Sequence, residues 1–334
     1  MTCLTRSGRC VASEVSETGP RGGRTAGELD RRVALVALWR MSRPAQLALI
    51  TLVYALGVAM AFGRGAEAEV GVVAVGLAAL LPTAASVHYA NEYADAETDA
   101  LTDRTPFSGG SGALVESGLP RPLALRAAVA SGAVGVALLV AGAAPVGGQM
   151  LGTVPAALLV AILLVGWQYS VRPLRLAWKG FGEVTNAVLG GVALPLYGFA
   201  VVTGGVTVAA ALATVPFALV VFVNLLETQW PDRRADAAVG KRTLATRWSA
   251  GRLRLAYGLG TVAAAGFAVA LAFLGAVFPR VVTLGTVLPM VGLIPGYYRF
   301  TRHEEPFPAV VTMVLVAAGS TIGWGLAATG AVTG

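Results

Sequence analysis

Charged residues, cysteine and histidine are all scarce in this 334-residue chain. Asp, Glu, Lys and Arg make up 13% of it, whereas 56% is hydrophobic. Disordered chains show the opposite balance, and soluble globular domains carry about twice this share of charge. The two cysteines, Cys3 and Cys10, lie in a polar N-terminal stretch. This placement excludes a disulfide framework and a thiolate metal site.

The few charges are clustered, and the stretches between them are long and apolar. A helix needs about 20 such residues to cross the hydrocarbon core of a bilayer. The pattern therefore predicts an all-α, polytopic membrane protein with nine transmembrane helices. The predicted spans lie near residues 45–62, 70–93, 122–142, 149–170, 182–203, 208–230, 254–278, 281–298 and 307–330. The eighth is the least regular, because it contains Pro289 and Pro295.

The segment before the first span differs in composition from the rest. Residues 1–33 contain arginines among Ser, Gly and Thr, without apolar periodicity. We expect a disordered N-terminal extension there and a membrane domain over residues 34–334. The extension contains no apolar stretch of the kind found in secretory signals.

The basic residues predict the orientation of the bundle. With nine spans in this order, every Lys and Arg except Arg64 and Arg280 falls before span one or after an even-numbered span. Basic residues collect in cytoplasmic loops, so we expect a cytoplasmic N-terminus and an external C-terminus in the cell membrane. Membrane topology thus accounts for the net charge of +7. No basic helix or aromatic platform for nucleic acid accompanies that charge.

Acidic residues gather at two places on the predicted cytoplasmic side, at the ends of spans two and six. The first cluster, Asn91–Asp99, has the pattern N-E-x-x-D-x-x-x-D, and the second runs from residue 228 to 236. Polar groups recur every four residues in each, which predicts one stripe along a helix. A base follows the last aspartate of each cluster at the same offset: Arg104 and Lys241. Pro231 is expected to break or kink the second helix.

Converging carboxylates need a cation. At an effective dielectric of about 20, each close pair of like charges costs on the order of a few kcal/mol. Oxygen ligands without nearby His or Cys favour Mg²⁺, which binds through one or two carboxylates plus substrate phosphates. We expect Mg²⁺ at Asp95, Asp99, Asp232 and Asp236, with phosphate oxygens contacted by Arg104, Lys241 and Arg242. The alternative is solvated helix ends with incidental acids, and the matched pair of clusters argues against it.

At this point the sequence resembles the UbiA superfamily of intramembrane prenyltransferases. The pattern of that family is N-[DE]-x-x-D-x-x-x-D after helix two and D-x-x-x-D after helix six. Asn91–Asp99 matches the first, Asp232 with Asp236 matches the second, and the resemblance covers about residues 40–330. It implies a helical bundle whose cavity holds a polyprenyl diphosphate, bridged by Mg²⁺ to the carboxylates. It also implies that Asn91 contacts the metal or a diphosphate oxygen.

Four further segments are more similar to the 1,4-dihydroxy-2-naphthoate branch, which serves menaquinone biosynthesis, than to the 4-hydroxybenzoate branch. They are residues 105–112, 169–176, 180–183 and 240–244. The sequence departs from many relatives at Thr228 and Gln229, where Asn and Glu are common. The implied reaction is ionisation of an allylic diphosphate, followed by attack of an electron-rich aromatic carbon on the allyl cation. Metal and bases would stabilise the departing diphosphate.

Five other residues have both a functional and an ordinary explanation. By resemblance, Arg43 and Arg175 contact the diphosphate, although positive charge on this side of the membrane explains them equally well. Tyr93 and Tyr169 are candidates to face the allyl cation or the acceptor, whereas aromatic residues near span ends are often interface anchors. His88, one helical turn before the first motif, either orients the acceptor and takes its proton or simply satisfies a hydrogen bond.

Other functions share parts of the pattern. Within the same class, the acceptor could instead be 4-hydroxybenzoate, a chlorophyll precursor or geranylgeranylglyceryl phosphate. An ion-coupled secondary transporter also uses intramembrane carboxylates, but near the middle of the membrane, whereas these lie at span ends among bases. Soluble-type isoprenoid synthases and phospholipid head-group transferases are set aside, because neither D-D-x-x-D nor D-G-x-x-A-R occurs in the sequence.

Overall fold

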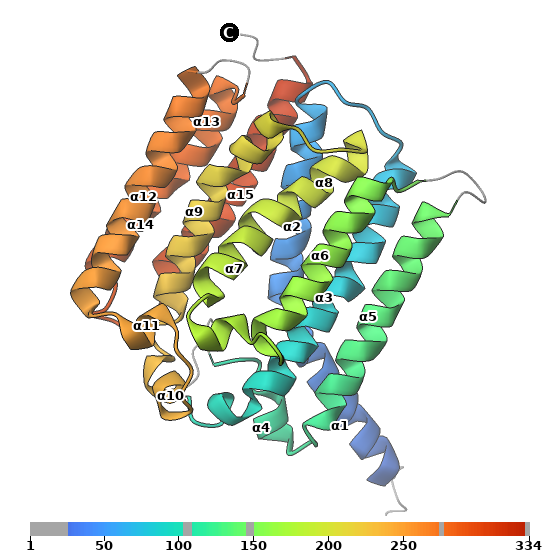
Figure 1. The fold of residues 1–334 in the computed structure, drawn as a ribbon, viewed down its shortest axis with the longest axis vertical. Coiled ribbons are helices and arrows are strands. Elements are labelled where there is room, and N and C mark those ends of the chain that lie inside the picture. Colours follow the sequence, from blue (N-terminus) through green and yellow to red (C-terminus); the bar gives the residue numbers. More distant parts are fainter. Residues whose placement is uncertain (1–25, 103–108, 145–149, 274–276, 331–334) are drawn as a thin grey trace, which may run out of the picture.

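The computed structural model describes residues 26–102, 109–144, 150–273 and 277–330. Within these ranges the chain is all-helical, without a β-strand, and nine helical segments are long and apolar enough to cross a membrane. The long helices run side by side in one bundle (Figure 1). The predicted all-α, nine-span architecture is confirmed.

The nine spans follow the predicted order closely. The first six are α2 (Pro44–Phe62), α3 (Val70–Asp99), α5 (Pro122–Ala143), α6 (Thr153–Ser170), α7 with α8 (Gly182–Val188, Leu194–Thr203) and α9 (Val208–Thr228). The last three are α12 (Ala250–Phe273), α13 with α14 (Arg280–Val287, Leu293–Arg299) and α15 (Phe307–Ala328). Shorter helices are α1 (Ala26–Met41), α4 (Ala113–Ser117), η1 (Leu176–Lys179), α10 (Arg233–Ala238) and α11 (Leu244–Arg247).

Two spans are interrupted by a change of helix type. In span five a π-helical turn, Leu189–Ala193, separates α7 from α8. In span eight a 3₁₀ turn, Leu288–Gly292, separates α13 from α14, and Pro289 lies in its first turn. Proline cannot donate a backbone hydrogen bond, which explains why the least regular predicted span is broken at this point.

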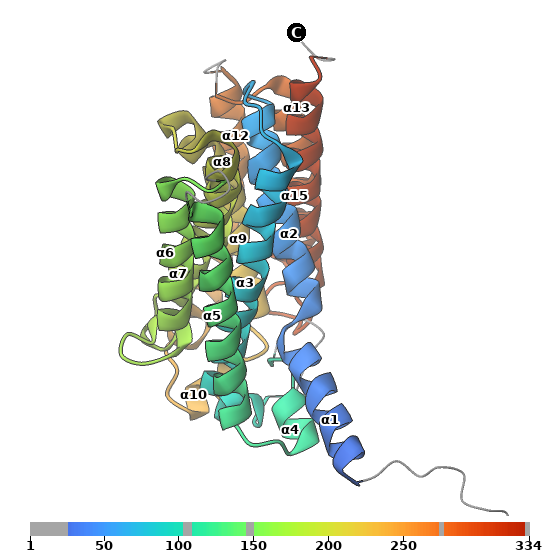
Figure 2. The same ribbon diagram turned by 90° about the vertical axis from the view of Figure 1, so that its right-hand side faces the viewer.

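The N-terminal boundary differs from the expectation. Helix α1 begins at Ala26, so residues 26–33, expected to be disordered, are helical. Ala37 and Met41 of α1 are buried, and α1 packs against α4, α3 and α5. These contacts stabilise α1 as a helix, and composition alone does not reveal them. In Figure 2, α1 leaves the bundle beside α4 and slants away from the parallel spans. Residues 1–25 lie outside the described residues.

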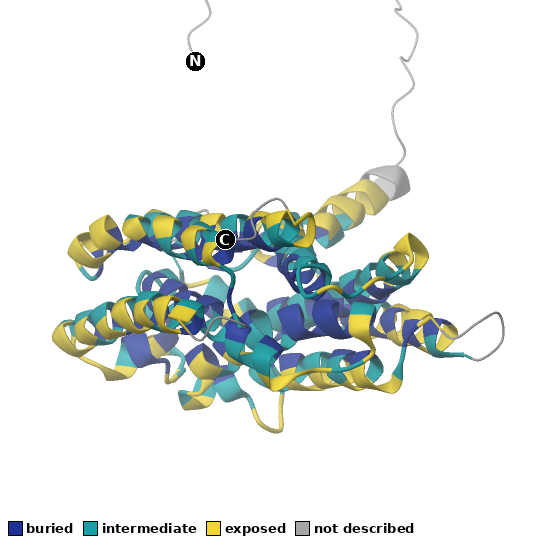
Figure 3. Ribbon diagram, turned by 90° about the horizontal axis from the view of Figure 1, so that it is seen from above, coloured by how far each residue is buried: buried dark blue, intermediate teal, exposed yellow. Residues whose placement is uncertain are grey.

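Small residues allow the closest helix crossing. A Cβ at Gly57 of α2 would lie 1.9 Å from the Pro195 carbonyl oxygen, and one at Gly198 of α8 would lie 2.3 Å from the Tyr54 oxygen. Such close backbone approach is typical of helix pairs in membranes. Seen from above, buried residues fill the middle of the bundle and exposed ones lie around its rim (Figure 3). Exposed apolar side chains such as Val262 and Ile322 lie on the long helices, as expected for spans in contact with lipid.

Both acidic motifs lie at one end of the bundle. Helix α3 ends there at Asp99, and the short helices α4, α10 and α11 cover the same end (Figure 1). Helix α15 ends at the opposite end of the bundle (Figures 1 and 2). The fold thus brings together two motifs that are more than a hundred residues apart in sequence.

Candidate active site

The first motif forms one continuous helical stripe, as predicted. Asn91, Asp95 and Asp99 occupy the last turns of α3, which continues without a break to Asp99. The indole Nε1 of Trp178 donates a hydrogen bond of 3.3 Å to Asp95 Oδ1. Trp178 belongs to η1, in the loop after α6, so the first motif is held from a different part of the chain.

The second motif does not form a helical stripe. Helix α9 ends at Thr228, and a new helix, α10, begins at Arg233. Pro231 lies in the break between them, because proline has no backbone N–H with which to continue a helix. Asp232 therefore occupies the N-cap position of α10 and Asp236 its first turn, where Asp236 is buried. The prediction of a single stripe was wrong here, whereas the predicted break at Pro231 is confirmed.

Lys241 joins the two motifs. Its Nζ lies 3.6 Å from Asp95 Oδ2 and 3.4 Å from Asp236 Oδ1. Burial lowers the pKa of Lys241, but the charges of Asp95 and Asp236 outweigh it and leave this pKa above its ordinary value. Burial raises the pKa of Asp236, and the adjacent Lys241 charge counteracts part of that rise. In the metal-free protein, an ammonium group thus balances one carboxylate from each motif.

The other two aspartates meet at residues 109–112, which we call the glycine segment. The Gly109 N–H donates to Asp232 Oδ2 at 3.3 Å. Gly110 has a φ of 64°, and a Cβ on it would lie 2.0 Å from Asp99 Oδ2. Only glycine combines this left-handed conformation with such close contact to a carboxylate. The glycine segment therefore connects the end of α3 to the start of α10.

This arrangement fits Mg²⁺ held jointly by protein and substrate. No group of three or more His, Cys, Asp or Glu in the described residues is close enough to hold an ion alone. The four aspartates instead form two pairs, one around Lys241 and one around the glycine segment. The buried Asn91 Oδ1 and Gln229 Oε1 have no hydrogen-bond partner. Mg²⁺ characteristically takes one or two carboxylates and completes its shell with waters and phosphates.

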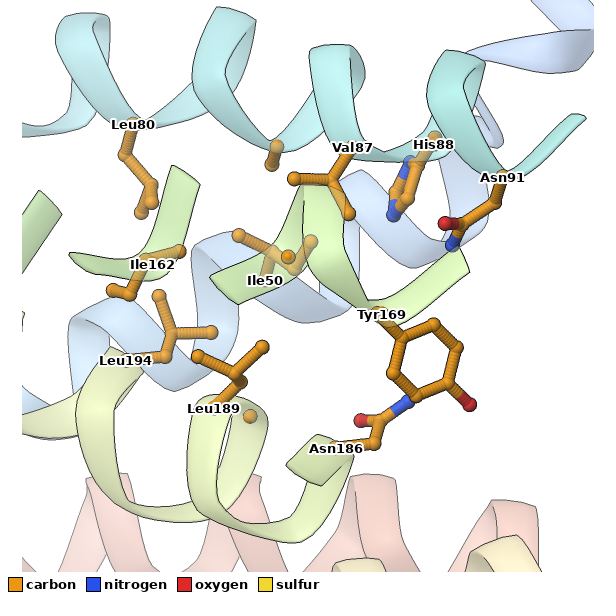
Figure 4. A pocket seen from close by; sticks show the side chains of 13 residues that line it. Ile50, Leu80, Val87, His88, Asn91, Ile162, Tyr169, Asn186, Leu189 and Leu194 are labelled. Atoms are coloured by element: carbon orange, nitrogen blue, oxygen red, sulfur yellow. The ribbon is translucent and has the colours of Figure 1, made fainter. Parts of the chain in front are cut away.

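A cavity of about 180 Å³ opens beside the first motif between α2, α3, α6 and the α7–α8 span. In Figure 4 its polar side chains, His88, Asn91, Tyr169 and Asn186, gather at one end, and aliphatic side chains such as Leu80, Ile162 and Leu194 line the other. The π-helical turn adds Leu189 and Gly190 to the wall. Such turns occur often at functional sites. The cavity thus has a polar mouth near the aspartates and an apolar interior.

His88 is held in one orientation. Its Nδ1 lies 2.7 Å from the Ser42 carbonyl oxygen, which can only accept a hydrogen bond. Nδ1 therefore carries the proton, and Nε2 is left as an acceptor. The structure also places Tyr169 in the cavity wall, where its hydroxyl interacts with the side chain of Asn186. Asn186 and Trp178 were not among the predicted site residues; a polar side chain inside an apolar span sets Asn186 apart in the sequence, whereas no local pattern marks Trp178.

Tyr93, Arg175 and Arg242 neither line this cavity nor take part in the contacts of the four aspartates. Tyr93 packs beneath Arg121, whose guanidinium carbon is 4.4 Å from the centre of the tyrosine ring. Arg175 stacks on Trp178 at 3.6 Å, and burial together with nearby Arg172 lowers the pKa of Arg175. Tyr93, Arg121, Arg172 and Arg175 line a separate hollow behind Trp178. The third residue, Arg242, is exposed, and its backbone N–H donates to the Trp178 carbonyl at 3.1 Å.

Two further predicted contacts with phosphate have different outcomes. Arg43 pairs with Glu92 at 2.6 Å, so its guanidinium is already engaged by a carboxylate. Arg104 lies outside the described residues. The sequence pattern around Arg43 gave no sign of the Glu92 partner, because the two belong to different spans.

Comparison with known proteins agrees with this geometry. The UbiA prenyltransferase family matches residues 48–316 of the chain. No curated protein gives a significant match. A solved UbiA homolog from Archaeoglobus fulgidus, bound to DMAPP and Mg²⁺, shares 18% identity with a TM-score of 0.64, covering 88% of this chain and 99% of that one. The apo structure of a UbiA homolog from Aeropyrum pernix K1 shares 17% with a TM-score of 0.61, covering 83% and 96%.

A third structure, of a digeranylgeranylglyceryl phosphate synthase, is 13% identical with a TM-score of 0.58, over 87% of this chain and 99% of that one. At these identities the solved structures establish the fold, and the family match extends over most of the helical bundle. With two aspartate motifs at one end of a nine-span bundle in the described residues, the chain belongs to the UbiA prenyltransferase family.

Proposed function

We propose that this enzyme is a Mg²⁺-dependent polyprenyltransferase of the cell membrane. It transfers the prenyl group of an allylic polyprenyl diphosphate to an aromatic acceptor, 1,4-dihydroxy-2-naphthoate, in menaquinone biosynthesis. The observation that carries the proposal is the meeting of the two aspartate motifs at Lys241 and the glycine segment, beside an apolar cavity. The A. fulgidus homolog bound to DMAPP and Mg²⁺ has the same fold.

Mg²⁺, when bound, neutralises charge that develops on the departing diphosphate. The residues that would hold it are Asp95, Asp99, Asp232 and Asp236, with Asn91 as a further oxygen donor. Lys241 lies between the motifs, and we assign it to contacts with the diphosphate. Once metal and diphosphate are bound, these charges would be held in place, so little further reorganisation would be needed as the allylic C–O bond breaks.

The cavity supplies the environment for the second half of the reaction. Its aliphatic walls exclude water from the allyl cation and accommodate the prenyl chain. At the polar end, His88 Nε2 can accept a hydrogen bond from an acceptor hydroxyl, and Tyr169 and Asn186 lie within the same wall. An aromatic carbon held there would form the new C–C bond to the prenyl group, and the carboxylate on that ring would leave as CO₂ to give the decarboxylated naphthoquinol.

The remaining predicted site residues have different roles in this proposal. Arg175 lies on the ring of Trp178, whose N–H holds Asp95, and so remains a candidate for diphosphate contact. Arg104 and Arg242 keep that role by resemblance. Tyr93 packs with Arg121 outside the cavity, which favours a structural role for it. Arg43 pairs with Glu92, and we assign it to the support of the site.

The acceptor rests on resemblance in residues 105–112, 169–176, 180–183 and 240–244. A second candidate is a prenylated glycerol phosphate, because the fold is shared with a digeranylgeranylglyceryl phosphate synthase. 4-Hydroxybenzoate and a chlorophyll precursor are the other acceptors of this class. The transporter alternative is dropped, because the chain belongs to a prenyltransferase family.

Purified protein tests this proposal with geranylgeranyl diphosphate and 1,4-dihydroxy-2-naphthoate. We expect diphosphate release coupled to a prenylated product in the presence of Mg²⁺, complete loss with EDTA, and recovery when Mg²⁺ is added back. Product formation at an undiminished rate in EDTA would contradict the role of the metal. Diphosphate release without a prenylated product would contradict the acceptor.

A further inference from the structure

The first motif includes one acid that is not among the proposed metal ligands. Glu92, directly after Asn91 on α3, is 2% exposed. Its Oε1 accepts from Arg43 Nε at 2.9 Å, from Arg43 Nη2 at 2.6 Å and from the Ser111 N–H at 2.9 Å. Its Oε2 accepts from the Ser111 hydroxyl at 2.6 Å. Both carboxylate oxygens are thus engaged by protein donors.

These bonds hold the glycine segment at its third residue. Ser111 is bonded through both its N–H and its hydroxyl, and its carbonyl accepts from Arg40 Nη2 at 3.0 Å. Arg40 in turn pairs with Glu116 of α4 at 2.7 Å. The segment is therefore anchored on one side to α3 and α1, and on the other side it reaches Asp232 and Asp99 through Gly109 and Gly110.

The two sets of contacts are only one or two residues apart. Gly110 precedes Ser111 directly and lies so close to Asp99 that a Cβ would not fit between them, so a shift of Ser111 would change the contact between Gly110 and this carboxylate. The Gly109 N–H would move relative to Asp232 in the same way. Charge-assisted hydrogen bonds of the Glu92 kind are about twice as strong as neutral ones, which makes them suited to fixing such a position.

We propose that Glu92 is a positioning residue, which acts through Ser111 and the glycine segment to set the spacing of Asp99 and Asp232. It binds neither metal nor diphosphate itself, and Arg43 serves to neutralise it. This inference rests on the proposed function, because it assigns Asp99 and Asp232 to Mg²⁺. It also gives the glycine segment a function: its backbone couples the two aspartate motifs.

The main test uses Ser111→Ala, which removes the hydroxyl bonds to Glu92 and to the Ala113 N–H and leaves the buried Arg43–Glu92 ion pair intact. We expect backbone amides of residues 109–112 to exchange hydrogen for deuterium about tenfold faster than in the wild type, in metal-free protein. We also expect the Mg²⁺ concentration for half-maximal transfer to rise about tenfold, with kcat at saturating Mg²⁺ near the wild-type value. Ser111→Thr keeps the hydroxyl and should restore both measurements.

The matched control is Glu97→Gln, since Glu97 lies on the same helix but is exposed and pairs with Arg121 at 3.1 Å. It should leave exchange at residues 109–112 and the Mg²⁺ dependence unchanged. Glu92→Gln should shift both in the same direction as Ser111→Ala, and the double variant should be less than additive, because both changes remove one connection.

Unchanged exchange in Ser111→Ala would overturn the anchoring. A Glu92→Gln variant with low kcat at saturating Mg²⁺ and normal exchange would show that Glu92 is itself a ligand, which also overturns it. Failure of the proposed function gives a different result: the wild type would show no Mg²⁺-dependent transfer, and the exchange comparison would still decide whether Glu92 holds the segment.

Discussion

Lys241 and Trp178 contact the two carboxylate oxygens of Asp95 before any substrate binds. The ammonium group lies 3.6 Å from one oxygen of Asp95, and the indole N–H donates to the other at 3.3 Å. Lys241 also reaches Asp236 at 3.4 Å. A cation from the protein therefore occupies the space between carboxylates that would otherwise repel each other. Binding of Mg²⁺ and diphosphate would exchange part of this pairing for metal and phosphate contacts.

Replacing one proposed ligand tests the metal assignment at this scale. We expect Asp95→Asn or Asp236→Asn to lower kcat/KM by about 10²–10³-fold, because charge stabilisation of the leaving group is lost. Folding should survive, since Lys241 keeps the other carboxylate as its partner in either variant. Product formation and thermal unfolding in detergent give the two readouts. Near-wild-type turnover of either variant at saturating Mg²⁺ would contradict the assignment.

A substitution at Trp178 alters the surroundings of Asp95 and leaves its carboxylate in place. Trp178→Phe removes the N–H donor and keeps an aromatic ring beneath Arg175. We expect transfer to fall about tenfold, as for the loss of one hydrogen bond to a charged group. Trp248→Phe is the control, because Trp248 is an exposed tryptophan outside the site. Equal activity of the two variants would mean that the indole N–H does not position Asp95.

The aspartates themselves could be predicted from the sequence, because their spacing is local and repeated. Glu92, Trp178 and Ser111 could not be assigned roles in the same way. Their partners are 19 to 83 residues away in the chain, and only the packed loops bring them together. The partner of Arg43 could not be predicted either. A basic residue at the end of a span looks the same in the sequence whether it contacts a phosphate or, as here, a buried carboxylate.

At the scale of elements, the glycine segment connects α3 with α10. Gly110 and Gly118 provide a matched comparison, because both have positive φ, but only a Cβ at Gly110 would meet Asp99. Replacement by alanine in either place strains the backbone by about 1 kcal/mol. We expect Gly110→Ala to abolish most transfer and Gly118→Ala to lower only the unfolding temperature. Similar transfer rates in the two variants would contradict the coupling of the motifs.

The length of the apolar run predicted the α3 span, and the four-residue spacing of Asn91, Asp95 and Asp99 predicted the polar stripe at its end. The same spacing failed for the second motif, where Pro231 ends α9 and Asp232 starts a new helix. The π-helical turn at Leu189–Ala193 was also beyond sequence reasoning, because a single wider turn does not alter an apolar span. Helix α1 gained order from its contacts with α4 and α3.

For the whole molecule, the distribution of charge predicts that the aspartate end faces the cytoplasm. Glu67, in the loop between α2 and α3, lies at the opposite end and is exposed. In a variant with Cys3→Ser, Cys10→Ser and Glu67→Cys, a membrane-impermeant maleimide should label intact cells. The wild type, with cysteines only near its N-terminus, should be labelled only after permeabilisation. The reverse pattern would place the active site outside.

The central claim is transfer of a prenyl group to a naphthoate acceptor, and a competition measures it most directly. Purified protein receives geranylgeranyl diphosphate, Mg²⁺ and an equal mixture of 1,4-dihydroxy-2-naphthoate and 4-hydroxybenzoate, with an EDTA control, and mass spectrometry identifies the products. We predict a prenylated, decarboxylated naphthoquinol that forms only with metal. Prenylated hydroxybenzoate as the main product would contradict the acceptor, and the absence of any prenylated product with either acceptor would contradict the claim itself.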